Sequence, residues 1–305
     1  MRGTTDFKAF DTFVEATRLF PATEQASLKA TEVFKKAYGL LEGLTKSNPE
    51  FPRALAWYGY ALSLTVSEGW PIDGFADEKL DLQQRLNVAR DRVLAARKMD
   101  ETDYDLWWAS ANVHLIRREF DLAEAAFKQA NYLNRDEVNA NLEAETADAL
   151  VHLGNLNMAE KNIRRAARQP DWYHWVRAWT YFVTAGRNRT DELTFLDLSL
   201  DEIKMTFGQP GDESYILEVQ LLLAAVHAAK KVVYEKMEGI SEEDRKRKIE
   251  RQLRATQRAI ARFAADFPYW NVEQAIRFAP FRNKTDEDYW RQNVDAAFKA
   301  LASGP

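Results

Sequence analysis

The sequence predicts an all-α fold, a right-handed α-solenoid of stacked helix pairs with an insert in the second pair and a helical cap at the C-terminus. The 305-residue chain contains only 12 glycines and 9 prolines, fewer helix breakers than soluble proteins usually carry. Its composition, 46% hydrophobic and 29% charged, is typical of a folded protein built from long helices. Small residues also recur at the intervals expected of a helix-pair repeat of about 34 residues.

Composition and charge exclude several classes of protein. The net charge of −5 and the 12% aromatic content exclude a disordered chain. The absence of cysteine excludes a disulfide scaffold, a thiol nucleophile and a cysteine-based metal site. Residues 1–8 contain no apolar signal-peptide core, and the longest apolar run, residues 221–226, is far shorter than the about 20 residues of a membrane span. We therefore expect a cytoplasmic protein without membrane or nucleic-acid partners, unless a leader has been removed.

The first half of the chain is predicted to contain two imperfect helix pairs. Residues 18–51 form a degraded repeat that ends at Asn48-Pro49, because proline cannot continue a helix. Residues 52–103 form a second repeat, in which residues 65–82 are an insert carrying the turn signals of Gly-Trp-Pro and Asp-Gly.

The two clearest repeats follow, at residues 104–137 and 140–173. Small residues at the eighth, twentieth and twenty-seventh places let antiparallel helices approach closely, and large residues between them fill the grooves. The residues that set this pattern are Trp107, Ala111, Ala123, Phe127 and Ala130 in the first copy and Ala147, Gly154, Ala159, Ile163 and Ala166 in the second.

The remainder of the chain is predicted to be helical but less regular. Residues 172–268 contain degraded repeats, with helices expected near 171–186, 191–198, 212–238 and 241–265. Residues 269–305 form the C-terminal cap, which includes a helix over 286–301. Because no linker rich in proline, glycine or serine divides the chain, residues 1–305 are predicted to form a single solenoid domain.

The spacing resembles that of tetratricopeptide repeats. The order of shorter fragments also resembles the C-terminal repeat module of bacterial class III adenylate/guanylate cyclases and of related winged-helix transcriptional regulators. These fragments are residues 9–13, 48–51, 170–173, 267–270 and 279–282. The resemblance implies a regulatory or interaction module. It does not imply cyclase activity, because nothing before residue 10 could form a catalytic or DNA-binding domain, and the chain ends in Ser-Gly-Pro where the family has Gly-Leu-Pro.

A search for catalytic and cofactor-binding patterns gives none. The histidines, at 114, 152, 174 and 227, include no pair on one helical turn and so form no zinc motif. Phosphate loops, dinucleotide fingerprints and nucleophile elbows are also missing from the sequence. Asp100, Asp103 and Asp105 lack the glycine and glutamate of a calcium loop and are expected to cap helices. The sequence therefore predicts a non-enzymatic protein without cofactor or metal.

Two side-chain stripes have a structural and a functional interpretation. Arginines recur at helical spacing between 247 and 262, which favours a solvated helix face over a surface for an acidic partner. Trp172, Trp175 and Trp179 also recur at helical spacing, which favours a core over a ligand cage. Trp70, in the insert, has two equal interpretations: a lid over the groove, or a seal on its own helices.

The resemblance to tetratricopeptide repeats places candidate binding residues on the first helix of each pair, which lines the concave groove. The candidates are Arg53, Tyr60, Trp108, Asn112, Asp148, His152, Tyr173 and Thr180. The set is aromatic and poor in cations, so it lacks the lysine-containing clamp that binds acidic C-terminal tails. The alternative in which the insert or the cap fills the groove stays open.

The sequence therefore predicts a scaffold that binds a protein or peptide partner in the groove, with homodimer formation left open. The alternative function is a regulatory module that senses a small molecule in an aromatic pocket beneath Trp70, associated with a cyclase or a transcriptional regulator.

Overall fold

The computed structural model describes residues 6–23, 28–134, 140–165, 170–206 and 217–303. Within these residues the chain forms fourteen α-helices and no strand, so the all-α prediction is confirmed. The chain divides into two compact units, residues 1–142 and 143–305, and each is described separately.

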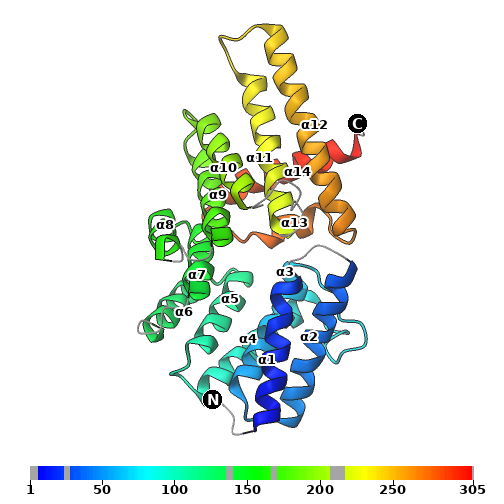
Figure 1. The fold of residues 1–305 in the computed structure, drawn as a ribbon, viewed down its shortest axis with the longest axis vertical. Coiled ribbons are helices and arrows are strands. Elements are labelled where there is room, and N and C mark those ends of the chain that lie inside the picture. The colour runs from blue at the N-terminus through cyan, green and yellow to red at the C-terminus, as the bar shows by residue number, and fades with distance from the viewer. Residues whose placement is uncertain (1–5, 24–27, 135–139, 166–169, 207–216, 304–305) are drawn as a thin grey trace. The chain divides into compact units, whose positions relative to one another are not determined.

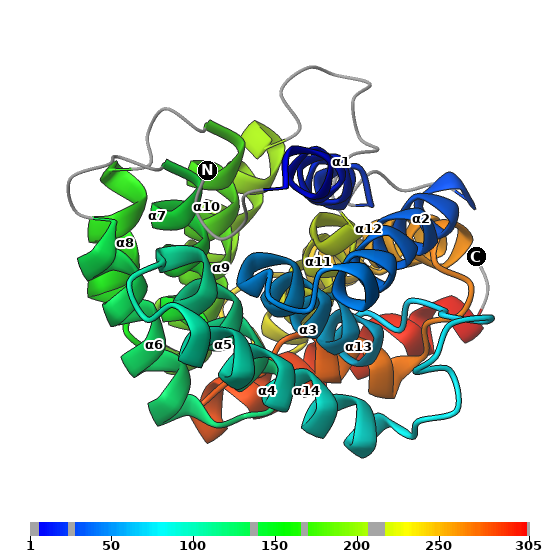
Figure 2. The same cartoon turned by 90° about the horizontal axis from the view of Figure 1, so that it is seen from below.

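Unit 1 consists of three helix pairs. Its helices are α1 (Phe7–Thr23), α2 (Leu28–Ser47), α3 (Pro52–Ser67), α4 (Leu82–Met99), α5 (Tyr104–Ile116) and α6 (Phe120–Leu133). Each odd-numbered helix packs against the helix that follows it, and α3 also contacts α2 and α5 (Figure 2). Contact between the first helices of successive pairs is the arrangement that a helical repeat requires.

Local sequence explains where these helices begin and end. The α2 helix ends at Ser47, directly before Asn48-Pro49, and α3 begins with Pro52 at its first position. Asp81 starts α4 through a reciprocal capping box with Gln84, which satisfies backbone N–H groups that have no partner within the helix.

Gly59 allows α3 and α4 to approach closely. A Cβ at this position would lie 2.8 Å from the carbonyl oxygen of Ala89 and 3.0 Å from Cγ1 of Val93. Gly59 occupies the eighth place of its repeat, so the close contact agrees with the reason for expecting a small residue there.

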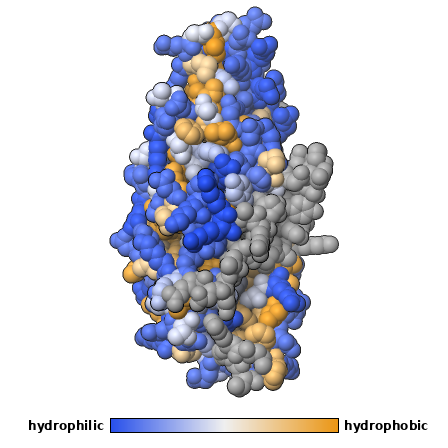
Figure 3. Space-filling model, turned by 60° about the vertical axis from the view of Figure 1, so that its left-hand side comes forward, coloured by the Kyte–Doolittle hydropathy of each residue, from blue (hydrophilic) through white to orange (hydrophobic). Residues whose placement is uncertain are grey.

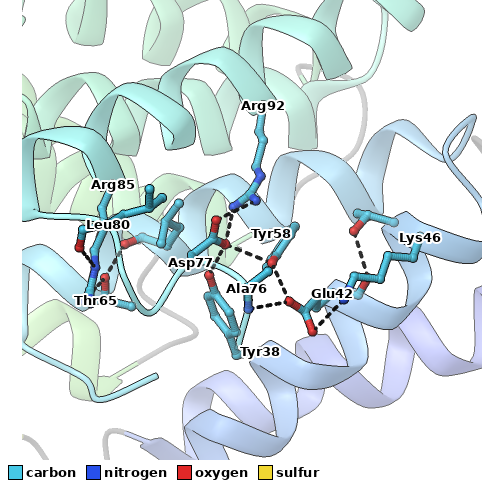
Figure 4. A network of polar contacts seen from close by, with 12 residues as sticks. Tyr38, Glu42, Lys46, Tyr58, Thr65, Ala76, Asp77, Leu80, Arg85 and Arg92 are labelled. Carbon is cyan, nitrogen blue, oxygen red and sulfur yellow. Dashed lines mark hydrogen bonds and ion pairs between the residues drawn. The ribbon is translucent and has the colours of Figure 1, made fainter. Parts of the chain in front are cut away.

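The insert is held against unit 1 by a buried carboxylate. Figure 4 shows the side chains of Tyr38 (α2), Tyr58 (α3) and Arg92 (α4) converging on Asp77. The two tyrosine hydroxyls donate to Asp77 at 2.6 and 2.9 Å, and Arg92 forms a bidentate pair at 2.9 and 3.0 Å. The segment between α3 and α4 is therefore fixed to three helices through one side chain.

Unit 2 contains the remaining helices, with the boundary falling inside α7. They are α7 (Ala140–His152), α8 (Leu156–Arg165), α9 (Pro170–Arg187), α10 (Glu192–Thr206), α11 (Leu217–Lys236), α12 (Glu242–Asp266), α13 (Val272–Phe278) and α14 (Lys284–Ala302). The main pairs are α9 with α10 and α11 with α12, and the last of these forms the long hairpin coloured yellow to orange in Figure 1.

The last helix completes the core of unit 2. The α14 helix contacts α9, α11, α12 and α13, and its Trp290 is fully buried with its ring 4.9 Å from that of Trp179. Arg187, at the end of α9, forms a bidentate pair with Asp286 at 2.8 and 2.5 Å. Gly186 lets α9 and α14 approach closely, because a Cβ there would lie 2.7 Å from the ring of Tyr289.

The helix pairs are compatible with a tetratricopeptide-like repeat, whereas a continuous right-handed solenoid stays a prediction. Several helix bounds lie near those predicted: Ser241 caps α12, and α14 covers the predicted terminal helix. The helix predicted near 191–198 is longer than expected, because α10 extends to Thr206. The predicted helix over 212–238 begins at residues outside the described ones, and α11 starts at Leu217. No described helix is long and apolar enough to cross a membrane. On the face drawn in Figure 3, hydrophilic residues predominate and hydrophobic residues form small, separate patches.

Candidate functional site

The candidate residues of unit 1 lie at an aromatic cluster formed by the first helices of its pairs. The ring of Trp108 (α5) lies 5.0 Å from that of Trp57 and 4.9 Å from that of Tyr60, both on α3. Phe20 of α1 adds a ring 5.4 Å from Trp57 and 6.5 Å from Tyr60. We call Phe20, Trp57, Tyr60 and Trp108 the aromatic cluster.

The aromatic cluster is partly open to solvent. Trp57 and Tyr60 are half-buried, whereas Trp108 is 8% exposed. The indole Nε1 of Trp57 is buried without a hydrogen-bond partner. The accessible rings of Trp57 and Tyr60 suit a partner that brings an apolar or aromatic side chain to this surface.

Asn112 adds an amide to the same helix as Trp108. Its Nδ2 donates to the carbonyl oxygen of Trp108 at 3.1 Å, and the side chain is half-buried. This bond uses one of the two N–H groups of the amide. This bond leaves the side-chain oxygen and the second N–H of Asn112 available. An extended peptide backbone can donate to the oxygen and accept from the N–H.

Arg53 forms ion pairs inside unit 1. Its Nε and Nη2 donate to the carboxylate of Asp103 at 2.5 and 3.0 Å, and its Nη1 lies 3.2 Å from Asp105. Burial by itself lowers the pKa of Arg53, but these carboxylates outweigh burial and raise the pKa. A ligand carboxylate would have to compete with two carboxylates of the chain itself. The structure thus places Arg53 as a link between α3 and the start of α5.

Trp70 is buried in the insert. It is 2% exposed, and its ring stacks on that of Phe34 in α2 at 5.3 Å with an interplanar angle of 14°. Its Nε1 donates to Glu68. This placement favours the sealing role of Trp70 over the role of a lid.

In unit 2 the structure brings Asp148 and His152 together, one turn apart on α7. Their nearest side-chain atoms, Oδ2 and Nε2, lie 3.7 Å apart, beyond hydrogen-bond distance. The ring of His152 packs 5.5 Å from Trp179 and 4.9 Å from Phe281. Both Oδ1 of Asp148 and Nδ1 of His152 are buried without hydrogen-bond partners.

Burial shifts the pKa values of Asp148 and His152 in opposite directions. It raises the pKa of Asp148 to about 7, although a hydrogen bond from Trp175 acts against the shift. It lowers the pKa of His152 to about 4. At neutral pH, His152 is therefore uncharged and Asp148 is close to half-protonated.

Tyr173 and Thr180 lie on α9. The hydroxyl of Tyr173 accepts a hydrogen bond from Arg177 at 3.2 Å, and Arg177 also pairs with Glu202 at 3.1 Å. Thr180 donates to the carbonyl oxygen of Val176 at 2.8 Å, within its own helix. Tyr173 thus belongs to a polar cluster between α9 and α10, while the hydroxyl proton of Thr180 is used locally.

Sequence reasoning did not identify Trp57 as a member of the aromatic cluster, and it missed the partner of Arg53. Trp57 occupies the sixth place of its repeat, next to a predicted groove place, and this position is the signal that indicates its exposure. Asp103 caps α5, and its contact with Arg53 spans 50 residues of sequence. In the described part of the chain, no cluster of three histidine, aspartate or glutamate side chains could hold a metal ion.

Comparison with known proteins adds no assignment. The chain matches no protein-family model, and no curated protein matches its sequence. The resemblance to tetratricopeptide and cyclase-associated modules therefore rests on the residues given above.

Proposed function

We propose that this protein is a non-enzymatic scaffold whose unit 1 binds an extended peptide segment of a partner protein. The observation that carries the proposal is the aromatic cluster, formed by the first helices of three pairs with Trp57 and Tyr60 half-buried. Tryptophan and tyrosine dominate the binding energy of many protein interfaces, because they offer large rigid surfaces at low entropic cost.

The chemistry around the cluster indicates what the peptide contains. Asn112 can bind the peptide backbone, as the groove of a helical repeat commonly requires. Arg53 already pairs with Asp103 and Asp105, so it offers little free positive charge to an acidic tail. The partner segment is therefore expected to carry aromatic or aliphatic anchor side chains rather than a run of acidic residues.

The small-molecule alternative receives less support. It requires Trp70 to cover a pocket, whereas the Trp70 ring stacks on the ring of Phe34 in α2. The proposed function thus keeps the peptide-binding role and does not use the insert.

Peptide selection followed by binding measurements tests the proposal. Random-peptide phage display against the full chain should enrich peptides with aromatic or leucine anchors. In fluorescence polarisation, the double variant Tyr60→Ala/Asn112→Ala should bind an enriched peptide at least about tenfold more weakly.

A matched control removes a tyrosine and an amide side chain from a second helix. Tyr132 and Gln129 lie on α6, and Tyr132 is 58% exposed. Tyr132→Ala/Gln129→Ala should leave affinity unchanged, with circular dichroism confirming that both double variants are folded. Equal affinity of both double variants and the unmodified chain, or enrichment of peptides dominated by Asp and Glu, would contradict the proposal.

A further inference from the structure

Unit 2 contains a cavity of about 850 Å³ between α10, α11 and α12. This volume lies within the range of about 300–1,000 Å³ of small-molecule sites. Five cationic side chains line it, against two carboxylates, Asp197 and Asp201. The cations are Lys204, Lys230, Arg251, Arg258 and Arg262. Because the chain as a whole has a net charge of −5, this excess of positive charge is local to the cavity.

The arginine stripe of α12 divides into two groups. Arg247 and Arg254 pair with carboxylates of their own helix, Asp244 at 2.7 Å and Glu250 at 3.8 Å. Arg251 and Arg258 line the cavity, and no residue of the described chain forms an ion pair with either. Arg251, Arg258 and Arg262 lie on one helix face over about 16 Å. They can therefore contact several anionic groups of one ligand.

Lys230, on α11, also lines the cavity. It is 6% exposed and pairs with Asp197, whose side chain is 54% exposed. A buried ammonium group is stable only with a compensating charge. An anion in the cavity would supply a second compensating charge to Lys230, next to the exposed Asp197.

His227 adds a neutral acceptor to the cavity. Its Nδ1 lies 2.7 Å from Oε1 of Gln252; since an amide oxygen only accepts, Nδ1 carries the proton and Nε2 is an acceptor. Burial lowers the pKa of His227 to about 4; the Gln252 bond opposes the shift, while Lys230, Arg258 and Arg251 add to it. The ring therefore stays uncharged at neutral pH, and its Nε2 suits a hydroxyl or amino group of a ligand.

We propose that this cavity binds a small organic polyanion, a molecule with two or more phosphate or carboxylate groups and a hydroxyl or amino donor. The cations along α12 and Lys230 bind the anionic groups, and His227 accepts from the donor. This site is separate from the peptide surface of unit 1, so the two proposals stand or fall independently.

Calorimetry on the full chain tests the site with three probes at constant ionic strength: inorganic tripolyphosphate, citrate and a hexaglutamate peptide. Tripolyphosphate or citrate should bind at one equivalent. Arg251→Gln/Arg258→Gln should weaken that binding at least about tenfold. Arg247→Gln/Arg254→Gln removes the same charge from the same helix outside the cavity and should change affinity less than about twofold.

Ring NMR of the unmodified chain gives a second readout that does not depend on a variant being folded. On addition of the bound probe, the His227 signal should shift, and the signal of His114, which pairs with Glu119 in unit 1, should not. The proposal is overturned if neither small probe binds, if both double variants lose affinity equally, if hexaglutamate binds more tightly than either small probe, or if His227 does not respond.

Discussion

At the scale of single residues, burial determines the charge of Asp148 and His152. A histidine whose pKa is lowered on folding stabilises the fold fully above its unfolded pKa, and this stability is lost as pH falls toward the folded value. A carboxyl group whose pKa is raised has the opposite pH dependence. Its proton is retained only in the folded state between the two pKa values, so stability falls as pH rises from about 4 to about 7.

Asp148→Asn removes the carboxyl group whose ionisation in the folded state lowers stability at neutral pH. The difference in melting temperature, variant minus unmodified chain, should be larger at about pH 8 than at about pH 4.5 by about 2 °C or more. The effect is limited because the Asp148 side chain is 27% exposed to solvent. Differential scanning fluorimetry at both pH values measures it. Asp288→Asn, at a side chain that is 56% exposed, should give the same difference at both pH values, and a flat profile for Asp148→Asn would show that burial does not raise this pKa.

At the scale of elements, the carboxylate of Asp77 ties the segment between α3 and α4 to three helices. Burial by itself raises the pKa of Asp77, but hydrogen bonds from Arg92, Tyr38 and Tyr58 outweigh it and hold the pKa below its usual value. The ionised carboxylate is thus the form that the fold selects, and removing its charge leaves Arg92 poorly compensated.

Asp77→Asn should lower the free energy of unfolding by about 3 kcal/mol, because it breaks a buried ion pair by removing one partner. Urea denaturation measures the loss, and limited proteolysis should show new cleavage between residues 68 and 81. The control is Asp73→Asn in the same segment, where the side chain is 72% exposed and pairs with Lys35 at 3.2 Å. Its cost should stay below about 1 kcal/mol. Equal costs for the two variants would refute the role of Asp77.

Helix positions were predictable from sequence because their signals are local. Asn48-Pro49 ends α2 and Ser241 caps α12, as chain chemistry requires. Contacts between distant segments were not predictable. The Arg251 side chain borders a cavity only because α10 and α11 supply its other walls, and nothing within α12 reveals their position. The repeat register placed Tyr60 and Trp108 on helices that do meet, but it could not show that Arg53 pairs with Asp103.

At the scale of the whole molecule, the chain divides into two compact units, residues 1–142 and 143–305, and the single solenoid domain that the missing linker predicted stays a prediction. A boundary inside α7 leaves no signal in composition, since a helix shared by two units has the sequence of an ordinary helix. Unit 2 depends on contacts between segments far apart in sequence, such as the Arg187–Asp286 pair, which spans 99 residues.

Asp286→Ala should therefore destabilise unit 2 by about 2 kcal/mol, because it removes a buried carboxylate from a bidentate pair. Hydrogen exchange followed by mass spectrometry should show lost protection in α9 and α14 and unchanged protection in residues 28–134. Asp295→Ala, which breaks an exposed pair with Lys299 on the same helix, should leave both regions protected. Equal loss of protection in the two units would mean that they unfold as one.

The position of Trp290 also bears on how the protein is made. Trp179 and Phe182 pack against the Trp290 side chain. Trp290 is synthesised more than about a hundred residues after them. Until Trp290 is synthesised, the rings of Trp179 and Phe182 lack this packing partner. The growing chain then exposes apolar surface to chaperones and to neighbouring nascent chains. Completion of the core of unit 2 must therefore await the synthesis of α14.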